Sequence, residues 1–213
     1  MRRTPELAPQ FSDLDQQHDA ATLGMWTFLG TEVLFFGGLI ALYCAYRTMH
    51  PVGFAAAARQ TEIAIGAGNT AIMLTSSFLV AWAVWCIRLN QGRAAAFLLW
   101  SAAALGVLFL GLKGAEYTIE YHEHLVPGLD SAVSGADAGA QQLFFAFYFV
   151  ATGLHGIHVV IGVVALVVIG RRSRARAYSA HYHAPATVVG LYWHFVDVVW
   201  IILFALIYLP GRS

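Results

Sequence analysis

Two histidines, His155 and His158, interrupt the apolar stretch GLHGIHVVIG at a spacing of three residues. The same spacing recurs in WHFVDVVW, where His194 is followed by Asp197. Residues three apart lie on one face of a helix, so each pair could direct both side chains toward one ligand. Imidazole suits iron, copper and zinc, and a carboxylate can complete such a ligand set. The pattern therefore suggests a metal or haem site within an apolar bundle.

Three further ionisable residues lie in apolar surroundings: Glu32 in LGTEVLFF, and Lys113 and Glu116 in GLKGAEY. A charge at the centre of a membrane helix costs about 2.5 to 3.5 kcal/mol, so such groups need partners or a function. Four interpretations fit these residues. The histidines with Glu32 or a second carboxylate could hold a metal, or His158 and His194 could hold a haem. The same groups could relay protons, or they could satisfy one another between helices.

The composition places these residues in a membrane protein. Of 213 residues, 59% are hydrophobic and 11% are charged, against about 25% charged residues in soluble domains. The formal net charge is zero, which gives no basic field for nucleic acid, and no nucleic-acid-binding motif is present.

Five segments are long and apolar enough to cross a bilayer, which requires about 20 residues in a helix. They cover approximately residues 22–46, 63–87, 94–121, 141–169 and 186–209. Without water in the bilayer core, segments of this length must be helices. We predict an all-α integral membrane bundle of five transmembrane helices over residues 22–210, preceded by an exposed tail over residues 1–21.

The arginines are distributed unequally between the two ends of this bundle. An odd number of spans puts Arg2, Arg3, Arg88, Arg93, Arg171, Arg172, Arg174 and Arg176 at one end, and Arg47, Arg59 and Arg212 at the other. The positive-inside rule then predicts a cytoplasmic N-terminus and an outer C-terminus. The run RRSRAR sets this topology, and its Arg171 and Arg172 are candidates for binding anionic lipid.

Several of these segments resemble subunit III of the haem–copper oxidases, the cytochrome c oxidase subunit 3 family. FVATGLHGIHVVIG and GLYWHFVDVVWIILFALIYL are similar to its last two helices, and LGMWTFLGTEVLFFGGL is similar to its helix with an embedded glutamate, here Glu32. NTAIMLTSSFLVAW and FLGLKGAEYTIEY resemble the two helices between them. The resemblance covers Leu23 to Pro210 in the family's order.

The resemblance implies a non-catalytic subunit of a bacterial terminal oxidase, which takes electrons from cytochrome c, reduces oxygen and pumps protons across the inner membrane. In this family haem and copper belong to subunits I and II, and subunit III binds no metal. It packs against subunit I, supports proton uptake, protects the active site during turnover and can bind phospholipid. On this basis His155 and His158 are structural.

Two departures leave alternatives within the family. Its long form has seven helices, and Lys113 stands where the mitochondrial-type pattern has an uncharged polar residue. KGAEY and HLVPG also resemble a short branch associated with nitric-oxide reductases, and the short quinol-oxidase form is another relative. Outside the family, a membrane metal or haem enzyme and a proton transporter remain alternatives.

The buried polar residues should pair within such a bundle, because an unpaired carboxylate in an apolar interior is costly. We expect Glu32 to pair with a histidine of the fourth span, in the first place His158. Asp197 should accept a hydrogen bond from a donor at similar depth, such as Tyr192 or a group of a partner subunit.

Overall fold

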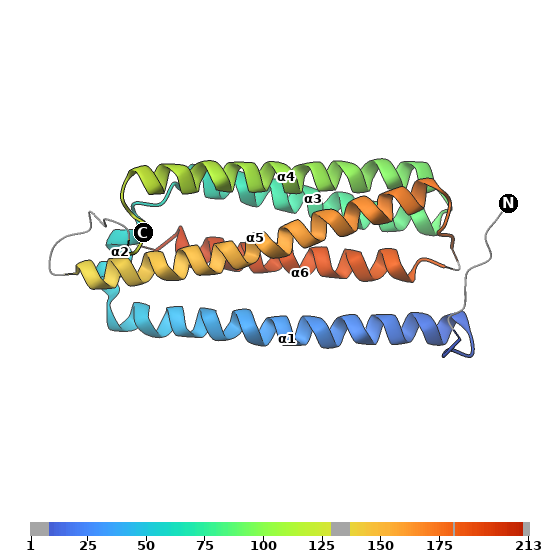
Figure 1. The fold of residues 1–213 in the computed structure, drawn as a ribbon, viewed down its shortest axis with the longest axis horizontal. Helices are drawn as coiled ribbons and strands as arrows, with labels where there is room; N and C mark the ends of the chain where they lie inside the picture. The colour runs from blue at the N-terminus through green and yellow to red at the C-terminus, as the bar shows by residue number, and fades with distance from the viewer. Residues whose placement is uncertain (1–8, 129–136, 181, 211–213) are drawn as a thin grey trace.

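The computed structural model describes residues 9–128, 137–180 and 182–210, and this part of the chain is almost entirely helical (Figure 1). The helices are α1 (Leu14–Met49), α2 (Pro51–Ala58), α3 (Ile63–Arg88), α4 (Gly92–His122), α5 (Ala138–Arg174) and α6 (Ala184–Ile207). No β-strand occurs within these ranges.

All helices except α2 are long and apolar enough to cross a membrane. These five helices have 24 to 37 residues, which corresponds to about 36 to 56 Å at 1.5 Å per residue. A typical hydrocarbon core is about 30 Å thick, so the helices project beyond it. The predicted all-α bundle with five membrane-spanning helices is confirmed.

Two local features differ from the sequence-based expectations. α1 begins at Leu14 rather than near Thr22, because the Asp13 side chain accepts a hydrogen bond from the backbone N–H of Gln16 at 2.7 Å and caps the helix. Residues 14–21 of the expected tail are therefore helical. The short helix α2 was not predicted; it begins at Pro51, whose fixed backbone angle suits the first position of a helix.

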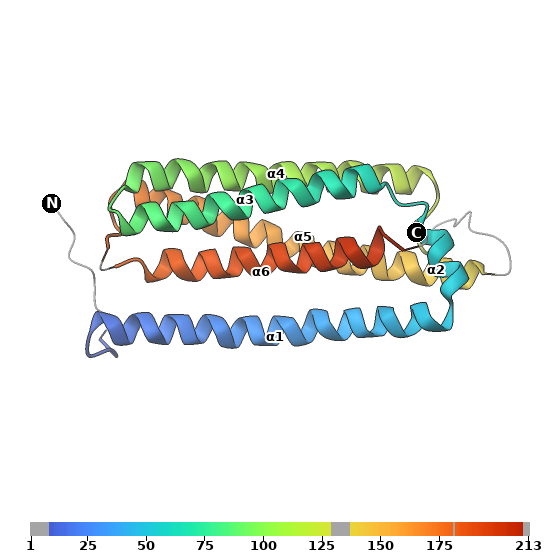
Figure 2. The same ribbon diagram turned by 180° about the vertical axis from the view of Figure 1, so that it is seen from behind.

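α3 and α4 form an antiparallel hairpin, joined by a turn in which Asn90 adopts a left-handed backbone conformation with φ of 60°. Seen from behind, α3 runs beside α4 and contacts α6, while α5 packs on both α4 and α6 (Figure 2). These four helices enclose the core of the bundle.

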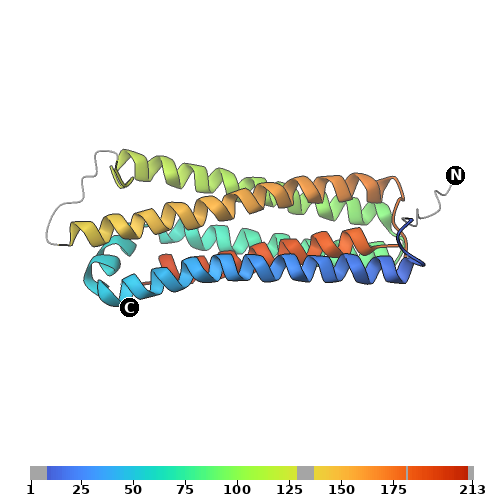
Figure 3. The same cartoon turned by 60° about the horizontal axis from the view of Figure 1, so that its bottom comes forward.

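α1 lies along one side of this four-helix core. It runs beside α6 and also contacts α5 (Figure 3). Only Leu29, Phe36 and Tyr43 of α1 are buried. The Tyr43 hydroxyl donates a hydrogen bond to the Leu206 carbonyl at 2.7 Å, which fixes the C-terminal part of α1 on α6.

Trp193 of α6 sets how closely the helices of the core approach one another. A Cβ atom on Gly162 of α5 would lie 2.6 Å from the Trp193 ring, and one on Gly106 of α4 would lie 2.9 Å from it. Such distances leave no room for a side chain, so glycine is required at both positions for the indole to fit between α4 and α5.

Candidate functional site

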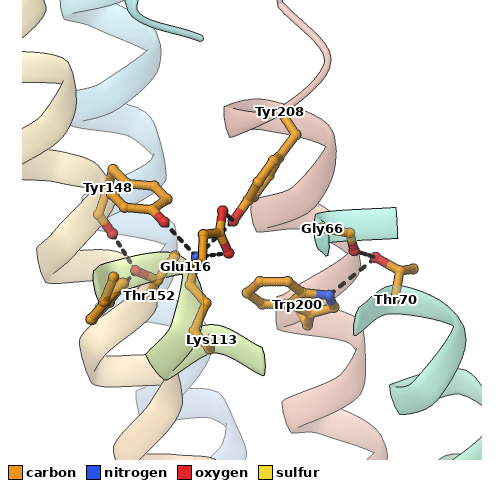
Figure 4. Close-up of polar contacts among 9 residues, drawn as sticks. Gly66, Thr70, Lys113, Glu116, Tyr148, Thr152, Trp200 and Tyr208 are labelled. Atoms are coloured by element: carbon orange, nitrogen blue, oxygen red, sulfur yellow. Dashed lines mark hydrogen bonds and ion pairs between the residues drawn. The ribbon is translucent and has the colours of Figure 1, made fainter. Parts of the chain in front are cut away.

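A group of buried polar side chains in the bundle interior is built around Lys113 of α4 (Figure 4). Its ammonium group donates hydrogen bonds to Glu116 Oε2 at 2.9 Å, to the Tyr148 hydroxyl at 2.7 Å and to the Tyr208 hydroxyl at 2.6 Å. The Tyr208 hydroxyl in turn donates to Glu116 Oε1 at 2.7 Å. We call these four residues the Lys113 cluster; they join α4, α5 and the end of α6.

The Lys113 cluster is closed to its surroundings. Lys113 is 5% exposed and Glu116 is completely buried. An ammonium group has three donors, and all three are used here. The ammonium also lies 4.3 Å from the centre of the Tyr148 ring, a distance at which a cation is attracted by the aromatic face. Lys113 and Glu116, which were predicted to share one helix face, thus form an ion pair, and all three donors of the ammonium group are used within the cluster.

A second chain of hydrogen bonds ties α6 to α3 near this cluster (Figure 4). The Trp200 indole N–H donates to the Thr70 hydroxyl at 3.1 Å, and that hydroxyl donates to the Gly66 carbonyl at 2.9 Å. Deeper in the bundle, the Trp193 indole N–H donates to the Ser76 hydroxyl, which donates to the Ala102 carbonyl of α4. Polar groups between membrane helices stabilise packing through such bonds.

Glu32 of α1 pairs with His158 of α5, as expected. The carboxylate Oε2 lies 3.2 Å from His158 Nε2, and both side chains are mostly buried. The other ring nitrogen, Nδ1, lies 2.8 Å from the Leu154 carbonyl. An imidazole held at both nitrogens has a fixed orientation, so this pair connects α1 to the core at a defined position.

Of the two partners expected for Asp197, Tyr192 is wrong, and a group of a partner subunit stays a prediction. Tyr192 donates its hydroxyl proton to the His158 carbonyl of α5 at 3.0 Å instead. Five residues along a helix correspond to a rotation of about 140°, so Tyr192 and Asp197 face different neighbours. His194 Nδ1 lies 2.6 Å from the Ser77 hydroxyl of α3. Asp197 is 5% exposed, and its Oδ1 has no hydrogen-bond partner in the described part of the chain.

His155 is completely buried, and neither ring nitrogen has a hydrogen-bond partner among the described residues. Its ring packs against Phe109 and Trp200, with ring centres 5.5 and 5.2 Å away. The expectation that both histidines of the motif supply internal hydrogen bonds therefore holds for His158 and is wrong for His155. His155 fills an aromatic core position.

The histidines proposed as ligands of a metal or haem contact different helices and do not face one common point. His158 faces α1, His155 lies between α4 and α6, and His194 faces α3. Within residues 9–128, 137–180 and 182–210, no three histidine, cysteine, aspartate or glutamate side chains come together as a metal-ligand group. Glu32 and Asp197 likewise lie on different helices, α1 and α6.

The two candidate lipid-binding residues, Arg171 and Arg172, are exposed in the last turn of α5. Nearby, the Arg174 guanidinium lies 5.7 Å from the centre of the Trp100 ring. Burial raises the pKa of Tyr178 in the following connection, and the positive charge of Arg172 acts against this shift. The end of α5 therefore presents a compact group of cations next to aromatic side chains.

Sequence reasoning missed the two tyrosines that complete the Lys113 cluster. Tyr148 lies within an aromatic run and Tyr208 near the chain end, where tyrosine is common at membrane interfaces. A usable signal was present, because a buried lysine has three donors and one glutamate cannot satisfy them all. Hydroxyl groups at the same depth on neighbouring helices were the available acceptors.

Comparison with known proteins finds the same family by a family model and by individual relatives. The family model described as Cytochrome c oxidase subunit III matches residues 15–212. The chain is 36% identical to cytochrome c oxidase subunit 3 of Thermostichus vulcanus over 91% of the chain and 89% of that protein. It is 33% identical to the protein of the same name from Synechocystis, over 90% and 76% of the two chains. The corresponding protein of Alkalihalophilus pseudofirmus is 30% identical over 89% and 86%.

Proposed function

The chain belongs to the cytochrome c oxidase subunit III family, and from this membership we propose that it is the non-catalytic subunit of a bacterial terminal oxidase. As a subunit III of a haem–copper oxidase, it is part of an oxidoreductase complex in a membrane. The observation that carries the assignment is the family match over residues 15–212, which covers α2 to α6 and all of α1 except its first residue.

We propose that this subunit packs directly against subunit I, is assembled with subunit II, and leaves the haem and copper to these partners. The arrangement of its own polar residues supports this division. Glu32, Lys113, Glu116 and His158 are engaged in contacts within the chain, and a side chain held in this way is not available as a metal ligand. Its contribution to oxygen reduction would be to stabilise subunit I and to support proton uptake.

The same proposal assigns a location and an orientation. The chain would lie in the bacterial inner membrane, with the residues before about Thr22 on the cytoplasmic side, residues 22–210 as the membrane domain and the end of α6 on the outer side. The arginine-rich end of α5 supports this orientation through the positive-inside rule. Arg171 and Arg172 would then face the anionic headgroups of the inner leaflet, where each cation contributes about 1 kcal/mol to the attraction.

The proposal can be tested by purifying the complex through an affinity tag on this chain. We expect subunits I and II to co-purify and the visible spectrum to contain the bands of haem a together with copper. Recovery of haem b without haem a would contradict a cytochrome c oxidase. Iron, copper or zinc bound to the separated chain and lost in His155→Ala would contradict a subunit without a redox centre.

A further inference from the structure

A second carboxyl group, that of Glu120, lies one helical turn beyond Glu116 on α4. Glu120 is 2% exposed, and neither of its carboxyl oxygens has a hydrogen bond of good geometry in the described residues. This differs from Glu116, whose two oxygens both accept hydrogen bonds. The polar side chain beside Glu120 is the Tyr148 hydroxyl, a neutral group that already accepts a hydrogen bond from Lys113. Burying a carboxylate without a partner costs far more than burying the neutral acid, so the state of Glu120 needs an explanation.

The cation nearest to this carboxyl is already engaged. The three donors of Lys113 are directed to Glu116, Tyr148 and Tyr208, which leaves none for Glu120. The ionisable groups around Glu120 are Lys113, Glu116 and Tyr117 on α4, Glu123 directly after α4, Tyr148 on α5 and Tyr208 directly after α6. One buried lysine therefore stands against two buried glutamates, and the two ionised carboxylates would leave one uncompensated negative charge.

The position of Glu120 in its helix also disfavours a negative charge. It lies in the last turn of α4, which ends at His122. The carbonyl groups at this end carry about half a negative charge through the helix macrodipole. The backbone N–H of Leu125 donates to the Glu120 carbonyl at 3.0 Å, so this capping bond satisfies the main chain and does not reach the carboxyl group.

We propose that Glu120 is a proton-binding site, whose carboxyl group holds one proton at neutral pH beside the ion pair of Lys113 and Glu116. With this proton the three ionisable residues sum to zero charge. The ligand is a proton taken up from the side of the membrane at which α4 ends, because Glu120 lies two residues from the end of that helix. The site is formed by residues of this chain alone, so the proposal does not depend on the identity of the partner subunits.

Infrared spectroscopy of the purified complex tests this directly. A step from neutral to alkaline pH should remove the carbonyl-stretching band of one protonated carboxylic acid and produce a carboxylate band in its place. The Glu120→Gln complex should lack this change. Glu123→Gln is the matched control, because Glu123 is exposed at the same helix end; it should retain the change. An unchanged difference spectrum in Glu120→Gln would overturn the proposal.

Thermal stability provides a second readout that does not depend on assigning a band. If Glu120 is protonated in the folded complex, Glu120→Gln replaces one neutral group by another of similar shape. The two proteins should then melt at similar temperatures at about pH 4, and Glu120→Gln should melt at a higher temperature at neutral pH, because only the wild type must take up a proton on folding. The wild-type complex should lose stability relative to Glu120→Gln as the pH rises above about 4.3, because the unfolded chain then releases a proton that the folded chain retains. A melting temperature lowered at neutral pH as strongly as in Lys113→Met would instead identify a paired carboxylate and overturn the proposal.

Discussion

The carboxylate of Glu32 lies 3.2 Å from the imidazole Nε2 of His158, and this contact holds α1 against α5. α1 buries few of its side chains against the rest of the chain, so this contact and the hydrogen bond from Tyr43 to the Leu206 carbonyl contribute much of its attachment. Family membership was inferred from the motifs that contain these two residues, and the structure brings them together across 126 positions of sequence.

Replacing His158 by leucine should weaken the attachment of α1. The substitution leaves the Glu32 carboxylate without its partner in a mostly buried place, which we expect to destabilise the protein by about 1 to 3 kcal/mol. The measurement is the apparent melting temperature of the detergent-purified complex. Ile157→Leu, at an exposed neighbouring position, is the control. Equal melting temperatures for His158→Leu and the control would show that the pair does not stabilise the bundle.

Replacing Lys113 by methionine should destabilise the protein more than His158→Leu does. It removes the buried cation and leaves the Glu116 carboxylate with one remaining donor, Tyr208. Breaking one side of a buried ion pair costs about 3 to 5 kcal/mol. The double variant Lys113→Met, Glu116→Gln removes both charges and should recover part of that loss in the same melting experiment. Additive losses would contradict the coupling between the two residues.

Replacing Gly162 by alanine should separate α5 from α6. The added methyl group would lie 2.6 Å from the Trp193 ring, and overpacking of this kind costs about 1 to 3 kcal/mol. Gly156→Ala on the same helix is the control, because its nearest neighbour outside the local helix backbone is Leu110 at 3.9 Å. The expected result is a lower melting temperature for Gly162→Ala alone, and a matching decrease in both variants would refute the packing argument.

The contact between His18 and His183 should make the start of α1 sensitive to acid. Their ring centres are 5.4 Å apart, and burial, followed by the positive charge of Arg88, lowers the pKa of His183. The neutral imidazole is therefore favoured in the folded protein, and its stabilising contribution is lost as the pH falls below the ordinary histidine value of about 6.5.

Hydrogen exchange of the first turns of α1 measures this effect. Exchange should become faster in wild-type protein as the pH falls below about 6.5, after correction for the intrinsic pH dependence of exchange. His183→Asn should lack this additional acceleration. The same acceleration in the variant would mean that another group controls this end of the helix.

The sequence was sufficient for the fold class because the apolar segments are long and the charges between them are few. It also predicted two contacts between ionisable side chains, because a buried ionisable group needs a polar partner. These are Lys113 with Glu116 on one helix face and Glu32 with His158 between two helices. The partners of Asp197 and His155 were not predictable in this way. They depend on the rotation of each helix about its axis, which is set by packing such as that of Trp193 against Gly162.

The central claim, that this chain is a non-catalytic subunit of a haem–copper oxidase, is tested most directly by comparing the oxidase purified with and without it. The measurement is the haem and copper content of each preparation together with its oxygen consumption over repeated turnovers. We predict equal haem and copper per subunit I and an initial rate that is largely retained, with faster loss of activity when the chain is absent. A loss of haem or copper in proportion to the missing chain would contradict the claim.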